Sequence, residues 1–111
     1  MLTTKAPPTK DQLALTYTDK DIKRVMEDGP SEVRRILFFI HEEKSNSCTF
    51  KELKDLLASH SVNDKGFSEL LEYLTKEKLL HMHLSDRGTM LTMTENAKAV
   101  LSRIDHGRVI R

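Results

Sequence analysis

The chain has 111 residues, of which 38% are hydrophobic, and its 18 Lys and Arg residues nearly balance its 17 Asp and Glu residues. This length predicts one compact domain, and a single Cys excludes an internal disulfide. The longest apolar run, residues 36–40, is far shorter than the roughly 20 residues of a membrane span, and residues 1–10 lack a signal peptide's apolar stretch. We therefore expect a cytoplasmic protein with no membrane partner.

Three regions are expected along the chain. Residues 1–18 are predicted to be a flexible tail, because they contain the proline pair Pro7–Pro8 and show no helical periodicity. Leu13, Leu15 and Tyr17 alternate, so a short extended segment packed on the domain is also possible. A folded domain is predicted over residues 19–106, and a C-terminal tail over residues 107–111.

The domain is expected to begin with a short helix over residues 19–27. Asp19 is its predicted N-cap, and Ile22, Val25 and Met26 share one apolar face. Gly29 and the proline after it are expected to end this helix.

A stronger helix is predicted from Ser31 to about Lys44. Its apolar residues recur at the spacing of a core-facing stripe: Val33, Ile36, Leu37 and Ile40. Phe38 and Phe39 widen that face beyond one core contact. We favour packing of the preceding helix there, and the alternative is a dimer interface.

Two short helices are predicted next, after a turn at residues 45–47 and a very short strand at Cys48 and Thr49. Thr49 and Glu52 form a capping box, and the helix that follows runs to about Ser59. Asn63 caps the second helix, which runs to about Glu77. The predicted inward residues of the pair are Phe50, Leu53, Leu56, Leu57, Phe67, Leu70, Leu71 and Leu74. The three-residue break between them predicts a helix-turn-helix.

After residue 78 the apolar period changes to two. Leu80, Met82 and Leu84 alternate with His81, His83 and Ser85, which predicts a half-buried strand with the histidines outward. A turn at residues 86–88 and the alternation of Thr89, Leu91 and Met93 complete a hairpin.

A last helix is predicted after the hairpin. Thr94 is its expected N-cap, and its core stripe is Ala97, Val100, Leu101 and Ile104. Gly107 is expected to end it. The expected fold class is therefore mainly α with a small β-hairpin (α+β): a three-helix core with a hairpin and flanking helices.

Residues 49–80, "TFKELKDLLASHSVNDKGFSELLEYLTKEKLL", resemble the helix-turn-helix of winged-helix transcriptional regulators. The hairpin and "MLTMTENAKAVL" are similar to their wing and closing helix, and the resemblance spans residues 31–104. In style it is closest to regulators of the MarR, ArsR and PadR kind. Lys78 and Ala97 stand where this family commonly has glycine.

The resemblance implies a DNA-binding regulator whose helix over residues 63–77 enters the major groove, with the hairpin over residues 80–93 as the wing. The outward face of that helix would supply the contacts: Lys65, Ser68, Glu69, Glu72 and Lys76, with Tyr73 on its flank. The alternative is a solvated face, neutralised by Lys65–Glu69 and Glu72–Lys76 pairs four residues apart.

Flanking cations are the expected phosphate contacts: Arg34, Arg35, Lys51, Lys54 and Arg87. Arg87, at the hairpin tip, is also suited to a narrow minor groove, although a turn residue that serves solubility explains it equally well. A net charge of +1 predicts modest affinity. It leaves open a second function, a winged-helix module that binds a protein partner.

A homodimer is expected on double-stranded DNA, through a surface drawn from Phe38, Phe39, Ile22, Met26, Val109 and Ile110. We predict no enzymatic activity, cofactor or metal, because no catalytic or ligand motif is present. A metal or pH role for His81 and His83 is less favoured than a solvated strand face. Cys48 is expected to fill space rather than sense redox state.

Overall fold

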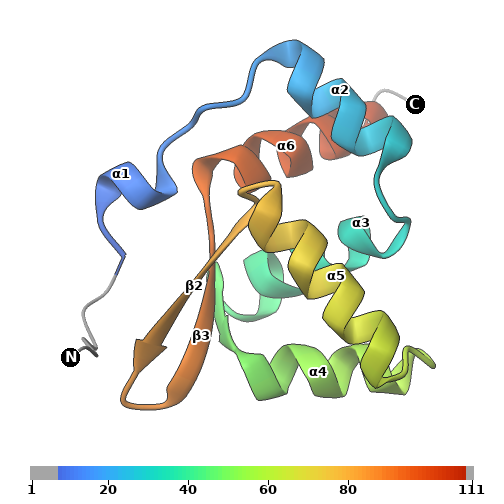
Figure 1. Ribbon diagram of the computed structural model, residues 1–111. Coiled ribbons are helices and arrows are strands. Elements are labelled where there is room, and N and C mark those ends of the chain that lie inside the picture. Colours follow the sequence, from blue (N-terminus) through green and yellow to red (C-terminus); the bar gives the residue numbers. More distant parts are fainter. Residues whose placement is uncertain (1–7, 110–111) are drawn as a thin grey trace.

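The computed structural model describes residues 8–109 as an α+β fold (Figure 1). Within that range, six α-helices and one π-helical turn surround a three-stranded antiparallel sheet. In chain order the elements are α1 (Lys10–Leu13), α2 (Asp19–Asp28), α3 (Glu32–Phe38), η1 (Phe39–Glu43), β1 (Ser47–Thr49), α4 (Phe50–Ser59), α5 (Asp64–Lys76), β2 (Leu80–Ser85), β3 (Gly88–Met93) and α6 (Glu95–Val109).

The predicted core stripes are confirmed. The residues of the predicted stripes on α3, η1, α4, α5 and α6 are all buried: Val33, Ile36, Leu37, Ile40, Leu53, Leu57, Phe67, Leu70, Leu74, Ala97, Val100, Leu101 and Ile104. Phe50, Leu56 and Leu71 pack against this core and are half-buried. The apolar periodicity therefore placed the helices correctly in the layer that covers the sheet.

The N-terminal segment differs from the expected tail. Residues 1–7 lie outside the described residues, but Thr9 caps the short helix α1 in a capping box with Gln12. Beyond it the chain is extended, and the backbone N–H groups of Thr16 and Tyr17 donate to Asn96 Oδ1 at 2.8 and 3.0 Å. Residues 16–17 are thus hydrogen-bonded to the start of α6. This agrees with the alternative prediction, an extended segment packed on the domain, rather than with a flexible tail.

Three predicted helix ends need correction. Thr18, not Asp19, is the N-cap of α2, because its hydroxyl accepts from the Asp21 N–H while the Asp21 carboxylate accepts from the Thr18 N–H. Ser31 stands at the N-cap of α3, but its side chain makes no capping hydrogen bond to the helix backbone. Gly107 does not end α6, which continues to Val109; a glycine costs a helix about 1 kcal/mol relative to alanine and does not forbid it.

The sheet has the order β1-β3-β2, with Cys48 opposite Leu91 and Met82 opposite Leu91 across its central strand. The helices cover this central strand, where Leu91 and Met93 are fully buried. On the edge strand β2, only Leu80 is buried. Met82 and Leu84 are therefore 44% and 45% exposed, so the expectation that both are buried is wrong.

The two histidines lie on the opposite, outward face of the hairpin, as predicted, and are half-buried there. His83 Nε2 lies 3.0 Å from Thr92 Oγ1, and the His81 and His83 rings stack with their centroids 6.0 Å apart. The two faces of β2 thus point as predicted, with Leu80 inward, but the inward face is left uncovered beyond Leu80 because β2 is an edge strand.

Candidate nucleic-acid interface

The helices α4 and α5 form a tightly joined pair. Thr49 and Glu52 cap α4 reciprocally, as predicted, and the Asn63 side chain accepts from the Gly66 N–H to cap α5. The rings of Phe50 and Phe67 meet edge to face, with centroids 5.0 Å apart. These contacts fix the angle at which α5 is presented.

Both helices of the pair end in the same way, on a residue with left-handed backbone. Ser61, after α4, has a φ of 68°, and Lys78, after α5, has a φ of 61°. The N–H of the next residue then bonds back to the helix, from Val62 to Leu57 O and from Leu79 to Leu74 O, each at 2.9 Å. This is the Schellman arrangement, which usually uses glycine. Lys78 thus adopts this geometry without a glycine.

The outward face of α5 is built as the sequence predicts. Phe67, Leu70 and Leu74 are buried, and the side chains on the opposite face are exposed: Lys65, Ser68, Glu69, Glu72 and Lys76. The alternative interpretation, in which intrahelical ion pairs neutralise this face, is wrong. None of these four charged side chains has an ion-pair partner within 4.0 Å in the part of the chain that the structure describes.

Tyr73 does not share this outward face. It is half-buried, and a Cβ atom added to Gly29 would lie only 2.7 Å from its hydroxyl oxygen. Its hydroxyl therefore rests against the link between α2 and α3. Burial, with a smaller contribution from Glu77, raises its pKa.

The cations around α5 are less free than expected. Lys51 Nζ is 3.0 Å from Asp55, Lys54 Nζ is 3.7 Å from Asp64, and Arg87 lies 3.8 Å from Glu52. Each of these three expected phosphate contacts thus has an acidic neighbour, either on α4 or at the start of α5. Solvent screening keeps such exposed pairs weak, at about 0–1 kcal/mol.

Glu52 is a residue whose wider role the sequence did not reveal. Besides capping α4, its carboxylate lies 2.9 Å from Lys44 Nζ and 3.8 Å from the Arg87 guanidinium. Hydrogen bonding from the Thr49 N–H, and then the Lys44 ammonium, lowers its pKa to about 2. Only its capping partner three residues away was visible in the sequence.

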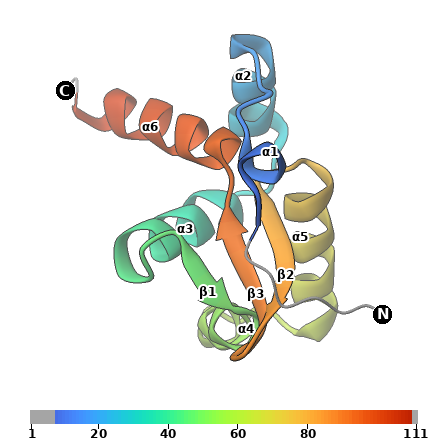
Figure 2. The same cartoon turned by 90° about the vertical axis from the view of Figure 1, so that its left-hand side faces the viewer.

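Arg34 and Arg35 have no ion-pair partner among residues 8–104, but they lie on α3 rather than beside α5. Figure 2 draws α3 to the left of the strands and α5 to their right, although the two helices also contact each other. The two arginines line a groove of about 630 Å³ with Phe38 and Phe39. The structure therefore does not bring them together with the α5 face.

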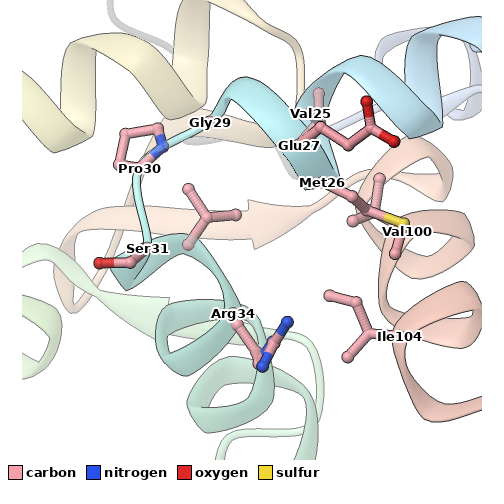
Figure 3. Close-up of a pocket in the computed structure, with 10 residues that line it drawn as sticks. Val25, Met26, Glu27, Gly29, Pro30, Ser31, Arg34, Val100 and Ile104 are labelled. Atoms are coloured by element: carbon pink, nitrogen blue, oxygen red, sulfur yellow. The ribbon is translucent and has the colours of Figure 1, made fainter. Parts of the chain in front are cut away.

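The predicted dimer residues are dispersed. Ile22 is only 7% exposed and belongs to the core, so it is not a surface residue. Met26 is 40% exposed and lines a pocket of about 320 Å³ between α2, α3 and α6, where Figure 3 shows it near Val100. The Val109 side chain and Ile110 lie outside the described residues.

The favoured explanation for Phe38 and Phe39, burial under the preceding helix, is wrong. That helix, α2, packs mainly on α6. The two rings are half-buried and line their groove with Leu56 and His60 of α4.

Cys48 and the histidines give no ligand site. Cys48 is 1% exposed, and burial raises the pKa of its thiol to about 11, so it stays protonated at neutral pH. Burial, followed by His83, lowers the pKa of His81. The described residues contain no group of three or more His, Cys, Asp or Glu side chains that could hold a metal ion. Nor is any described helix long and apolar enough to cross a membrane.

No protein-family model, curated protein or solved structure matches this chain. The features that bear on function are therefore the geometry of the α4–α5 pair, the hairpin and the charges around them.

Proposed function

We propose that residues 32–93 form a winged helix-turn-helix domain that binds double-stranded DNA and regulates transcription. In this proposal α5 is the recognition helix and the β2–β3 hairpin is the wing. Two features support it: the element order α3–β1–α4–α5–β2–β3, and a sheet in which the hairpin pairs with the short strand β1. The capped and edge-to-face-packed α4–α5 pair is the expected presentation of such a helix.

The observation that carries the proposal is the exposed face of α5, on which Lys65 and Lys76 have no acidic partner among the described residues. Eleven residues separate them, so at a rise of about 1.5 Å per residue they lie roughly 16 Å apart along the helix. A major groove about 12 Å wide admits a helix, and the two ammonium groups would then meet phosphates on either side of it. Ser68 lies between them and can donate to, or accept from, a base edge.

The acids on this face restrict what the helix can read. Glu69 and Glu72 would be repelled by phosphates, but each carboxylate can accept a hydrogen bond from the amino group of a cytosine. We therefore expect the preferred sites to place cytosine opposite at least one of them. Replacement by glutamine should relax that preference.

Arg87 is the proposed wing contact. Its side chain is 68% exposed, and its ion pair with Glu52 is long, at 3.8 Å. An exposed pair of this kind is worth about 0–1 kcal/mol, so the guanidinium can exchange Glu52 for a DNA phosphate at little cost.

Fluorescence anisotropy with a labelled random duplex, measured from low to moderate salt, tests the proposal. Wild type should bind at low salt with an affinity that falls steeply as salt rises. The double variant Lys65→Ala/Arg87→Ala should lose two phosphate contacts and flatten the slope of log K against log salt by about 1.8. Lys20→Ala/Lys23→Ala on α2, which removes the same charge, is the matched control. Absence of binding at low salt, or equal loss in the control, contradicts the proposal.

A second candidate function is a winged-helix module that binds a protein. Glu69 and Glu72 have no ion-pair partner among the described residues, while Lys51, Lys54 and Arg87 are all paired with acids. A mixed-charge protein surface would suit this face. In that case the duplex should not bind, and Glu69→Ala/Glu72→Ala should weaken the protein complex.

A further inference from the structure

The groove on the α3 side has an ordered arrangement of charge. It is lined by two rows of residues at a spacing of four: Arg34, Phe38 and Glu42 in one, and Arg35, Phe39 and Glu43 in the other. Basic side chains thus occupy its N-terminal end, half-buried aromatic rings its floor, and acidic side chains its C-terminal end.

The π-helical turn η1 keeps these rows aligned. In a regular α-helix, residues four apart drift steadily around the axis, because one turn takes 3.6 residues. The wider turn at Phe39–Glu43 takes up more residues per turn and reverses this drift. Both glutamates therefore line the same groove as both arginines.

Among the residues whose side chains the structure describes, the charges at the two ends of the groove are almost unpaired. In residues 8–104, Arg34, Arg35 and Glu43 have no ion-pair partner within 4.0 Å, and Glu42 has only the weak contact of 3.9 Å with His41. Lys44, at the acidic end, is already paired with Glu52 and stacks over the Phe39 ring at 5.9 Å. The groove thus presents unpaired charge of opposite sign at either end of an apolar floor.

We propose that this groove binds the same groove of a second copy of this chain, with the two α3 helices antiparallel. Eight residues separate each arginine from the glutamate in its row, or roughly 12 Å along the helix. A two-fold axis at Phe38 and Phe39 would set the arginines of each copy opposite the glutamates of the other. Parallel packing would oppose like charges. Such a self-complementary patch is what a two-fold dimer requires.

This dimer leaves the α5 face open, because the residues that line the groove belong to α3, η1 and α4 or directly flank them, and none lies on α5. The inference does not depend on DNA binding. The groove is smaller than a standard interface of about 20–30 residues a side. We therefore expect a weak dimer whose population depends on concentration.

Sedimentation equilibrium of the full chain over a concentration series tests the proposal by charge reversal. Wild type should show a monomer–dimer equilibrium. Arg34→Glu/Arg35→Glu makes both ends of the groove acidic, and Glu42→Arg/Glu43→Arg makes both ends basic. Each variant alone should dimerise at least about tenfold more weakly, because like charges then face each other.

An equimolar mixture of the two variants should dimerise again, since each acidic end then meets a basic one. That rescue also demonstrates that both variants are folded. Lys20→Glu/Lys23→Glu, an equal charge change on α2, is the matched control and should dimerise like wild type. A wild-type chain that stays monomeric up to about 1 mM, reversal variants that dimerise like wild type, or a mixture that remains monomeric overturns the proposal.

Discussion

Arg87, at the tip of the hairpin, lies 3.8 Å from the carboxylate of Glu52 in the first turn of α4. This contact ties the wing tip to the helix pair across 35 positions of sequence. It also means that a DNA phosphate would compete with the Glu52 carboxylate for the Arg87 guanidinium. The strength of that competition can be measured.

Replacing Glu52 with glutamine should increase the affinity for duplex DNA. Glutamine can still accept from the Thr49 N–H and maintain the capping box, but it releases Arg87 and Lys44. One added phosphate contact would steepen the slope of log K against log salt by about 0.9, as anisotropy titrations can measure. Asp19→Asn, which releases Arg103 at 3.1 Å, is the control and should leave the slope unchanged. Equal steepening in both variants would show that the location of the released cation is irrelevant.

The same residue predicts an acid-dependent loss of stability. The pKa of Glu52 is lowered from its ordinary value of 4.5 to about 2 in the folded chain. The folded state thus binds fewer protons than the unfolded state between these values, so this contribution is present above pH 4.5 and is lost as pH falls toward 2. Thermal melts should show a smaller decrease in Tm over this range for Glu52→Gln than for wild type. If Tm fell equally with pH in the two proteins, groups other than Glu52 would cause the loss of stability in acid.

Glycine at the two left-handed helix ends should stabilise the protein. A residue with a Cβ atom costs about 1–2 kcal/mol in this backbone region, whereas glycine does not. Ser61→Gly and Lys78→Gly should therefore each raise the free energy of unfolding by about 1 kcal/mol, measured by urea denaturation. Lys76→Gly, in the last helical position of α5, should lower it by about 1 kcal/mol. Destabilisation by Lys78→Gly would mean that its side chain, rather than its φ, matters there.

Asn96 should be a critical buried polar residue. Only 1% exposed, it accepts from the Thr16 and Tyr17 N–H groups and donates to the Lys78 carbonyl at 3.2 Å. Truncation leaves polar groups unpaired, each costing about 1–3 kcal/mol. Asn96→Ala should therefore lower the free energy of unfolding by at least about 2 kcal/mol, while the exposed neighbour Glu95→Ala should stay within about 0.5 kcal/mol. If both variants lowered the free energy of unfolding by similarly small amounts, Asn96 would not be critical for stability.

The sequence predicted most of the fold because local patterns determine it. Helical stripes, the Thr49–Glu52 capping box and the change of period at residue 80 each reflect contacts within a few residues. The hairpin was predicted correctly, but the exposure of Met82 and Leu84 was not. That exposure depends on β2 being an edge strand, which only the paired sheet defines.

The candidate site was less predictable, since its charges are arranged by tertiary contacts. Helical spacing predicted Lys65–Glu69 and Glu72–Lys76 pairs that the structure lacks. It could not reveal the contact of Arg87 with Glu52, or that of Lys54 with Asp64 across the turn. The left-handed backbone conformation of Lys78 was likewise not predictable, because a non-glycine residue gives no local signal for positive φ.

The arrangement of the two tyrosines has a spectroscopic consequence. The chain has no tryptophan and only two tyrosines, and both lie where the N-terminal segment and α2 meet α5. The Tyr17 hydroxyl donates to the Glu77 carbonyl, and Tyr73 rests against Gly29. Intrinsic tyrosine fluorescence therefore reports on the contact of the N-terminal segment and α2 with α5, and on no other region. Release of the N-terminal segment would change the emission, whereas rearrangement at the hairpin tip would leave it unchanged.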